Sequence, residues 1–281
     1  MNYNEILVLN GKGISVLYTK MYETVAKMVL QYYNTNQFVN TVFVVNTLVD
    51  ENSENVDYRS MCPGARQYIY YQLNNLQLNP EYTVLEYMSQ FDEIWECNQS
   101  NMTFYNDDVK DKVVYMPLRY VDIPRVPKKD SYKYDIGFIG TLTPSRQDML
   151  FRISRCWTDD YCKIKTITGY PYSELYDDIS ECKYLIDLPR EIGLSKILNS
   201  SRILEAVCSG KQILTYLLPD KDNQFTWLTV GYTNVYEITN LVKKDPVDNA
   251  DVFKDWTTNN KTYEEYRQYL MGDNYKQKLV L

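Results

Sequence analysis

The sequence predicts an α/β protein built from two Rossmann-like domains that face each other across a cleft. Short apolar runs rich in β-branched residues alternate with segments of helical periodicity over roughly the first 120 residues. Residues 121–132 then contain two prolines and the charged run Lys128-Lys129-Asp130, a composition typical of an interdomain linker. The alternation restarts at Tyr134. Strands that alternate with helices favour parallel sheets covered on both faces.

The first half opens with a predicted strand over Glu5–Asn10 and a glycine turn that contains Gly11 and Gly13. Apolar residues at helical spacing follow over Ile14–Tyr33, so strand, turn and helix together are expected to begin a Rossmann-like half. The third glycine of the dinucleotide-binding pattern is missing, and the turn is interpreted as a place where a ligand approaches backbone amides on the acceptor side. Further strands are expected at Thr41–Thr47, Gln67–Gln72, Glu93–Glu96 and Val113–Met116, with a helix from Pro80 through Met88.

The second half repeats the alternation, and we expect domains at residues 1–125 and 133–258. A C-terminal helix within residues 259–281 is expected to pack back on the first domain. The predicted strands are Tyr134–Ile139, Lys163–Thr168, Lys183–Leu188, Gln212–Leu217 and Tyr232–Ile238. The predicted helices are Pro144–Trp157, Ser173–Cys182, Ser201–Cys208 and Tyr263–Lys278.

The composition is that of a globular protein, with 44% hydrophobic and 24% charged residues among 281. A net charge of -7 disfavours nucleic acid as a partner, because that affinity rests on Lys and Arg neutralising phosphates. No apolar run approaches the roughly 20 residues of a membrane span, and no signal peptide opens the chain. A cytoplasmic location is therefore expected, in the host cytoplasm if the protein is viral.

Histidine is absent from the chain. This excludes Ser-His-Asp and Cys-His catalysis as well as His-ligated metal sites. The six cysteines show no CxxC spacing, so zinc ribbons and thioredoxin-like motifs are unsupported. Any acid or base must be a carboxylate, Tyr, Lys or Cys.

Polar residues in the segment NSSRILEAVCSGKQILTY, residues 199–216, carry the clearest functional pattern. Arg202 and Glu205 lie one helical turn apart, before a helix stop at Ser209-Gly210 and a buried strand. An Arg offers paired donors that suit a diphosphate, and a Glu one turn later can accept from the two hydroxyls of a ribose. The pattern indicates a nucleotide-sugar site, whereas the alternative is an exposed ion pair on an ordinary helix.

The second half resembles the donor domain of small GT-B glycosyltransferases, of the viral and bacterial spore-protein glycosyltransferase-like (CgeB-like) type. The similar segments there are YDIGFIGTLTPSRQDML (134–150), ECKYLIDL (181–188) and SSRILEAVCSG (200–210). In the first half, QYIYYQLNNL (67–76), DEIWECNQSNM (92–102) and VVYMPLRY (113–120) resemble the acceptor domain. The resemblance covers most of the chain in the expected order.

This resemblance implies transfer of a sugar from a nucleotide-sugar, expected to be UDP-linked, to a glycan or other hydroxyl acceptor, with no obligatory metal or other cofactor. Arg202 would stabilise the leaving diphosphate and Glu205 would bind the ribose of the donor. Gly140, Thr141 and Arg146 would lie at or near the diphosphate, and Tyr170 and Ser201 complete the expected donor-binding set. The chain departs from the family pattern at Asn74, where relatives often have an acid, and at Asp187, where they often have Asn.

The catalytic base is the least determined part of the expected site. A transferase that inverts configuration needs a carboxylate to accept the proton of the acceptor hydroxyl. Asp50, Glu51 and Glu96 each follow or end a predicted strand of the first half. Glu96 is preferred because it lies in a segment that carries the resemblance. An enzyme that retains configuration would not require such a base.

Three rival interpretations remain open. Asp220-Lys221-Asp222 matches the DxD pattern that binds manganese in GT-A glycosyltransferases, which would make the enzyme metal-dependent. A second possibility is a nucleotide- or sugar-binding protein of the same fold that has lost its chemistry. A third is a phage glycosyltransferase that modifies DNA, which the acidic composition disfavours.

Overall fold

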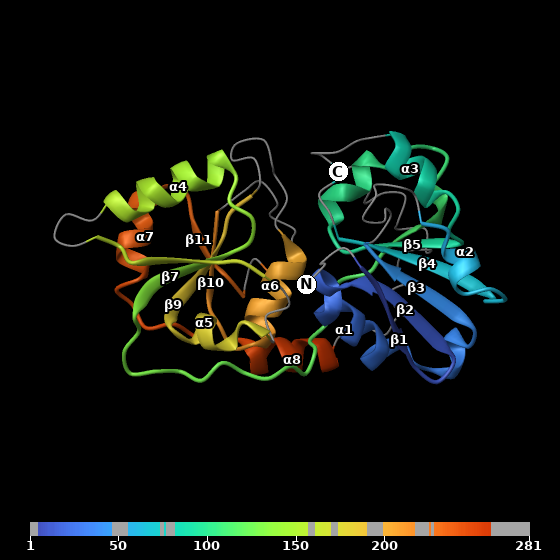
Figure 1. Cartoon of the computed structure of the whole chain (residues 1–281), viewed down its shortest axis with the longest axis horizontal. Helices are drawn as coiled ribbons and strands as arrows, with labels where there is room; N and C mark the ends of the chain where they lie inside the picture. Colours follow the sequence, from blue (N-terminus) through green and yellow to red (C-terminus); the bar gives the residue numbers. More distant parts are fainter. Residues whose placement is uncertain are drawn as a thin grey trace. The chain divides into compact units, whose positions relative to one another are not determined.

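The computed structural model describes residues 5–46, 56–73, 76, 82–156, 161–169, 174–189, 199–216, 225 and 228–259. The chain forms two compact units: unit 1 takes in Met1–Val121 and Thr258–Leu281, and unit 2 takes in Asp122–Thr257. Each unit contains one mainly parallel β-sheet with helices beside it (Figure 1). The predicted α/β class with two such sheets is confirmed.

The sheet of unit 1 has six strands in the order β1-β2-β3-β4-β5-β6. Strands β2 to β6 run parallel, so their carboxyl ends share one edge of the sheet, whereas β1 pairs antiparallel with β2. The interior strands are largely buried on both faces, as expected where helices cover both sides. The strands are β1 (Ile6–Asn10), β2 (Ile14–Thr19), β3 (Thr41–Val45), β4 (Gln67–Gln72), β5 (Glu93–Glu96) and β6 (Val113–Tyr115).

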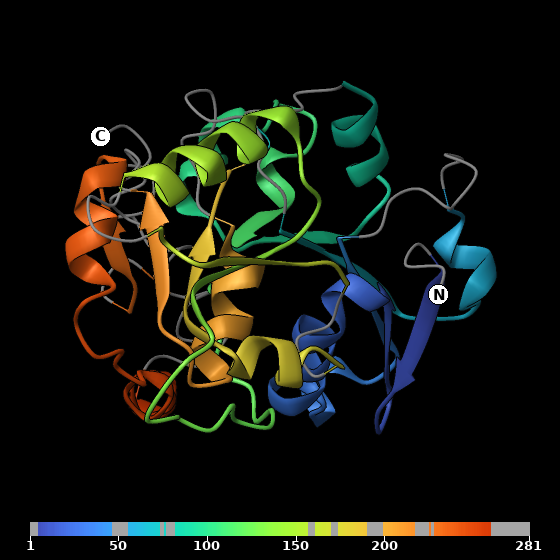
Figure 2. The same cartoon turned by 60° about the vertical axis from the view of Figure 1, so that its left-hand side comes forward.

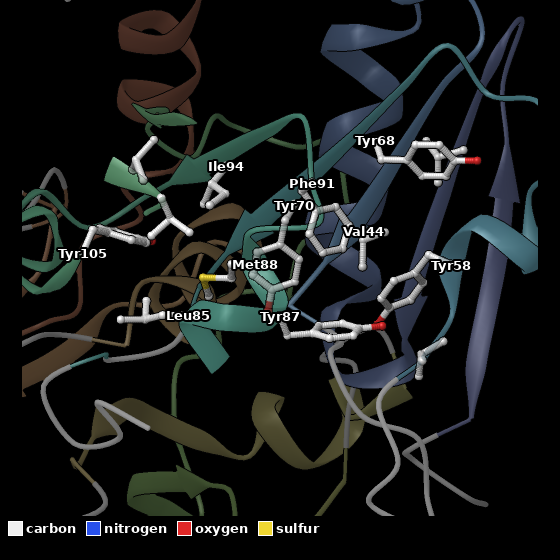
Figure 3. Packing of buried hydrophobic residues seen from close by; sticks show 14 of the residues in the cluster. Val44, Tyr58, Tyr68, Tyr70, Leu85, Tyr87, Met88, Phe91, Ile94 and Tyr105 are labelled. Atoms are coloured by element: carbon white, nitrogen blue, oxygen red, sulfur yellow. The ribbon is translucent and has the colours of Figure 1, made fainter. Parts of the chain in front are cut away.

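Helices of unit 1 pack against both faces of this sheet. On one face, the ring of Tyr33 from α1 lies 4.6 Å from that of Trp95. On the other face, Met88 of α3 and the adjacent Phe91 join a cluster around Tyr70, whose ring is 5.2 Å from that of Phe91 (Figure 3). The helices are α1 (Glu23–Tyr33), α2 (Tyr58–Met61) and α3 (Tyr82–Met88), with short 3-10 turns η1 (Lys20–Tyr22), η2 (Asn36–Phe38), η3 (Gln99–Phe104) and η4 (Lys110–Lys112).

The sheet of unit 2 has five parallel strands in the order β11-β10-β9-β7-β8. Strand β7 lies next to β9, and a Cβ atom at Gly137 of β7 would come within 2.8 Å of the Cys182 sulfur. The glycine thus permits the close packing of these two strands. The strands are β7 (Tyr134–Ile139), β8 (Ile164–Ile167), β9 (Cys182–Asp187), β10 (Ile213–Tyr216) and β11 (Val230–Tyr232).

Helices α4 and α5 lie on opposite sides of this sheet (Figure 1, Figure 2). Leu150 and Ile153 of α4 join Ile238 of α7 in one core cluster over the strands. Helix α6 is buried along its length, with only Ser201 partly exposed, and it contacts β9 and β10. The helices of unit 2 are α4 (Pro144–Arg155), α5 (Tyr176–Ser180), α6 (Ser200–Cys208), α7 (Val235–Leu241) and α8 (Ala250–Asn259).

Two predicted elements are wrong. Residues Ile14–Thr19 form strand β2 and not the first turns of a helix, because α1 begins only at Glu23. Gly11 and Gly13 therefore turn an antiparallel hairpin between β1 and β2. In unit 2, the strand predicted over Tyr232–Ile238 ends at Tyr232, and helix α7 follows. The predicted helix Tyr263–Lys278 lies outside the described residues.

The segment that joins the two sheets forms ion pairs and a backbone hydrogen bond with unit 2. Arg125 forms ion pairs with Asp248 at 3.3 Å and Asp251 at 2.5 Å. The backbone amide of Val126 donates to the carbonyl of Ser209, directly after α6. Within the described ranges, no helix has the length and apolar character needed to cross a membrane.

Candidate functional site

The candidate site lies at the carboxyl edge of the unit 2 sheet, where ligands of open α/β sheets usually bind. Strand β7 ends at Ile139 and is followed by Gly140, whose φ of 139° is a backbone conformation that favours glycine. Strand β9 ends at Asp187, and α6 begins at Ser200. Three chain segments thus meet at the end of neighbouring strands.

Arg202 lies in the first turn of α6 and is nearly buried, with 6% of the residue exposed. Its Nη1 atom donates to Oδ1 of Asp187, which is itself 2% exposed. Its guanidinium carbon also lies 5.8 Å from the centre of the Phe138 ring. The ion pair joins the end of β9 to the start of α6 and fixes the guanidinium.

Asn199 caps helix α6. Its Oδ1 atom accepts from the backbone amide of Arg202 at 3.1 Å and from the hydroxyl of Ser201 at 3.0 Å. The backbone N–H of Asn199 donates to Oδ2 of Asp187 at 3.5 Å. A capped start of this kind presents backbone N–H groups and the positive end of the helix dipole to the edge of the sheet.

Glu205 lies one turn further along α6 and is 3% exposed. The interpretation of Arg202 and Glu205 as an exposed surface pair is therefore wrong, since both side chains are buried. Burial, and after it the charge of Glu205, raises the pKa of the nearby Tyr176 to about 12. Tyr176 is thus a neutral phenol beside this carboxylate at physiological pH.

Arg146 of α4 holds two loops of the site together. Its Nε and Nη2 atoms donate to the carbonyl of Leu188 at 3.1 and 3.0 Å, and its Nη1 donates to the carbonyl of Thr141 at 2.8 Å. Its guanidinium carbon lies 5.4 Å from the ring of Phe138, the ring that Arg202 also approaches. The two arginines that the sequence singled out are therefore brought together around one aromatic side chain.

Glu96, the preferred base in the sequence analysis, is fully buried at the end of β5. Its Oε1 accepts from the amide of Asn98 at 2.7 Å, and its Oε2 accepts from Nδ2 of Asn101 at 3.1 Å and from the hydroxyl of Tyr105 at 2.7 Å. Burial raises the pKa of Glu96 to about 8. A group enclosed in this way holds the loop around η3 and does not match a base that reaches an acceptor hydroxyl.

Of the remaining predicted residues, the structure describes Gly11 and Gly13. Gly11 and Gly13 precede β2 and so lie at the amino edge of the parallel strands, opposite the edge at which Glu96 ends β5. Asp50, Glu51, Tyr170, Asp220 and Asp222 lie outside the described residues. Among the residues that the structure describes, no group of three or more His, Cys, Asp or Glu side chains is arranged to hold a metal ion.

Sequence reasoning missed two contributors to the site. Asp187 was noted only as a departure from the family pattern, although an acid at the end of the apolar strand KYLID was a usable signal. Tyr232 of β11 is buried, and burial followed by the charge of Asp187 raises the pKa of its phenol. No sequence signal connects Tyr232 to Asp187, because their proximity depends on the order of β9, β10 and β11.

No family model matches the chain, and no curated protein matches it. Similar solved structures include a mutant of S. aureus TarM in complex with Fondaparinux, alpha-GlcNAc-glycerol and UDP, at 12% identity and a TM-score of 0.47. The similarity covers 88% of this chain and 56% of that one, so this chain spans about half the length of TarM.

Two further similar structures are AviGT4, a glycosyltransferase involved in Avilamycin A biosynthesis, and T4 phage BGT in complex with UDP and Mn2+. AviGT4 is 12% identical with a TM-score of 0.42, over 83% of this chain and 75% of that one. T4 phage BGT is 12% identical with a TM-score of 0.44, over 86% of this chain and 84% of that one. Since all three TM-scores are below 0.5, no activity is transferred from these proteins to this chain.

Proposed function

We propose that the chain is a glycosyltransferase of the GT-B type. It moves a sugar from a nucleotide-sugar donor, taken as UDP-linked, to a hydroxyl group of a glycan or small-molecule acceptor. The observation that carries the proposal is the buried Arg202, held by Asp187 at the carboxyl edge of the unit 2 sheet and at the capped start of α6. The resemblance of residues 134–150, 181–188 and 200–210 to GT-B donor domains supports the same assignment.

The chemistry of transfer requires positive charge at this position. The bond between the anomeric carbon and the diphosphate oxygen breaks, and a bond forms between that carbon and the acceptor oxygen. Negative charge grows on the nucleoside diphosphate as it leaves. The guanidinium of Arg202 and the N–H groups at the start of α6 offset that charge.

The other donor-binding residues are assigned around this centre. Glu205 accepts from the ribose hydroxyls, and Gly140 with Thr141 lies beside the diphosphate. Ser201 and Tyr170 complete the donor-binding set. Arg146 is a positioning residue, because its donors are directed at the carbonyls of Leu188 and Thr141, which hold the loops after β9 and β7.

The base is assigned to the segment that follows β3. Asp50 and Glu51 come after this strand, whose carboxyl end shares an edge with those of β4 and β5. Glu96 instead supports the neighbouring loop through Asn98 and Tyr105. The variants Asp50→Asn and Glu51→Gln are made separately. The variant that abolishes transfer to an acceptor identifies the base.

The proposal includes catalysis without an obligatory metal. A metal-dependent alternative would use Asp220 and Asp222. Turnover measured in EDTA separates the two: retained activity supports the metal-independent enzyme, and a loss restored by Mn²⁺ assigns the reaction to the DxD pair.

The whole proposal is tested with the full chain and a panel of UDP-, GDP- and CMP-linked sugars. A donor that binds the native state raises the melting temperature, and a transferase releases the donor's nucleotide (UDP, GDP or CMP) when an acceptor is added. We expect a rise with UDP-sugars and release of UDP. No rise with any donor would overturn the assignment. Binding without release would show the inactive binding protein instead.

A further inference from the structure

A pocket of about 390 Å³ opens at the amino edge of the unit 1 sheet. It is walled by the hairpin between β1 and β2, the start of β3 and the loop that follows α2. Its volume falls within the range of sites that hold small molecules. Strands β2, β3 and β4 begin here, so the pocket lies at the opposite edge of the sheet from Glu96 and the segment that follows β3. It is therefore a site separate from the carboxyl edge at which Asp50 and Glu51 are proposed to act.

The pocket is lined by uncharged groups. Amide and hydroxyl side chains come from Asn10, Ser15, Asn40 and Thr41, and none of the residues that line it is Asp, Glu, Lys or Arg. Cys62 is the single thiol in the lining, and burial raises its pKa, so that it stays neutral. Such a lining offers hydrogen bonds without a counter-charge, which suits a neutral ligand rich in hydroxyl groups.

Two asparagines of the lining are held by hydrogen bonds, Asn10 through its side chain and Asn40 through its backbone. The hydroxyl of Ser15 donates to Oδ1 of Asn10 at 2.8 Å, which orients that amide. Asn40 has a φ of 61°, and its backbone amide donates to the carbonyl of Gly13 at 2.6 Å. Its backbone carbonyl accepts from the amide of Arg66 at 2.7 Å. With both backbone groups bonded, the exposed Asn40 side chain has no hydrogen-bond partner among the described residues.

Two exposed apolar residues flank the lining residues in the sequence. Val39 and Met61, each next in sequence to a residue that lines the pocket, are 43% and 44% exposed. A sugar ring presents hydroxyl groups at its edge and C–H groups on its face, so it can use both kinds of contact at once. None of the residues that line the pocket offers a charge opposite to that of a charged ligand.

We propose that this pocket binds one uncharged sugar unit, with the Asn40 amide and the Asn10–Ser15 pair as its hydrogen-bonding groups. The proposal does not depend on the assignment of the donor site. The ligand can be a free monosaccharide or one residue of a glycan chain, and the experiment separates these two sources.

The test follows alkylation of cysteines by mass spectrometry in the intact protein. Cys62 and Cys156 are the two partly buried free thiols among the described cysteines, and Cys156 lies in the other unit. Neutral monosaccharides and neutral oligosaccharides, added separately, are expected to slow the alkylation of Cys62 while Cys156 reacts as before. Protection by the oligosaccharide alone identifies a glycan chain as the source. Protection of neither thiol, or equal protection of both, would overturn the proposal.

A matched pair of variants locates the contact. Asn40→Gly removes the amide and keeps the left-handed backbone, which glycine adopts freely. It is expected to weaken sugar binding about tenfold, the loss of one or two hydrogen bonds. Asn36→Gly makes the same change at an exposed residue outside the pocket and is expected to leave binding unchanged. Equal affinity of the Asn40→Gly and Asn36→Gly variants for the sugar would contradict the assignment. So would equal protection of Cys62 by a deoxy analogue and by its parent sugar.

Discussion

The guanidinium of Arg202 and the carboxylate of Asp187 form a buried ion pair. Only 6% of the Arg202 side chain and 3% of the Asp187 side chain are exposed. The pair joins the end of β9 to the first turn of α6. Burial, and after it the charge of Asp187, raises the pKa of the Tyr232 phenol. Pairing offsets part of the cost of placing each charge in the interior. The two charges cancel before a ligand arrives, so an anionic ligand competes with Asp187 for the guanidinium.

Asp187→Asn is expected to reduce stability and to increase affinity for anions. Removing the carboxylate takes away one partner of a buried ion pair, which costs about 3 kcal/mol of unfolding free energy. Without the competing Asp187 charge, the guanidinium should bind UDP and inorganic pyrophosphate about tenfold more tightly. Urea denaturation and calorimetric titration measure the two effects.

Asp148→Asn is the matched control for that change. Asp148 pairs with Arg152 on the surface of α4, where both side chains are more than half exposed. Its loss is expected to change the unfolding free energy by less than about 1 kcal/mol and to leave UDP affinity unchanged. Equal effects of the two substitutions would show that the buried pair has no special role.

Glu96→Gln is expected to alter how stability depends on pH. Burial raises the pKa of Glu96 from 4.5 to about 8, so the folded state holds a proton that the unfolded state releases. The wild-type protein should therefore lose a few kcal/mol of stability as pH rises from about 4.5 to about 8, and then level off. The glutamine variant lacks this titration and should be the more stable protein at pH 9. Parallel curves for the two proteins between pH 5 and 9 would contradict this explanation.

Gly137→Ala tests the packing beneath the site. The added Cβ would lie 2.8 Å from the sulfur of Cys182 and 3.0 Å from Cδ2 of Leu185, so these side chains or the strand that carries them must shift. We expect a loss of about 1–3 kcal/mol in thermal or urea unfolding. Cys182→Ala in the same chain removes the opposing sulfur, so the double variant should recover part of the loss. Strict additivity of the two changes would exclude this contact as the cause.

The sequence predicted the elements whose signals are local. Strand Tyr134–Ile139 was predicted with its observed bounds, and α4 begins at Pro144 as predicted, because a proline follows the capping Thr143. The stop of α6 at Ser209-Gly210 was also predicted, and Gly210 adopts a φ of 77°. Such signals come from residues that are close in the sequence, so they can be recognised without knowledge of tertiary contacts.

Errors arose where the pattern was ambiguous or a cap was overlooked. Strand β2 is buried on both faces, so its apolar run lacks alternation and merges with the helical pattern of α1. The start of α7 had a readable signal: Asn234 accepts from the amide of Glu237, and Glu237 accepts from the amide of Thr233, as in a capping box.

The arrangement of the site depends on contacts that no local pattern encodes. Asp187 and Arg202 are 15 residues apart and meet only because α6 packs beside the end of β9. The enclosure of Glu96 likewise depends on Tyr105, which returns to it from the far side of η3. The sequence therefore predicted which residue types carry the chemistry more readily than what each side chain contacts.

The most direct test of the central claim compares two arginine-to-lysine variants in the release of UDP from a UDP-sugar. Arg202→Lys keeps a positive charge opposite Asp187 but loses the planar fork that suits a diphosphate. Arg152→Lys makes the same change on the exposed face of α4. If Arg202 stabilises the leaving diphosphate, the first variant should lose about 100-fold in kcat with its fold intact, and the second should keep the wild-type rate. Wild-type turnover by a folded Arg202→Lys protein would contradict the assignment.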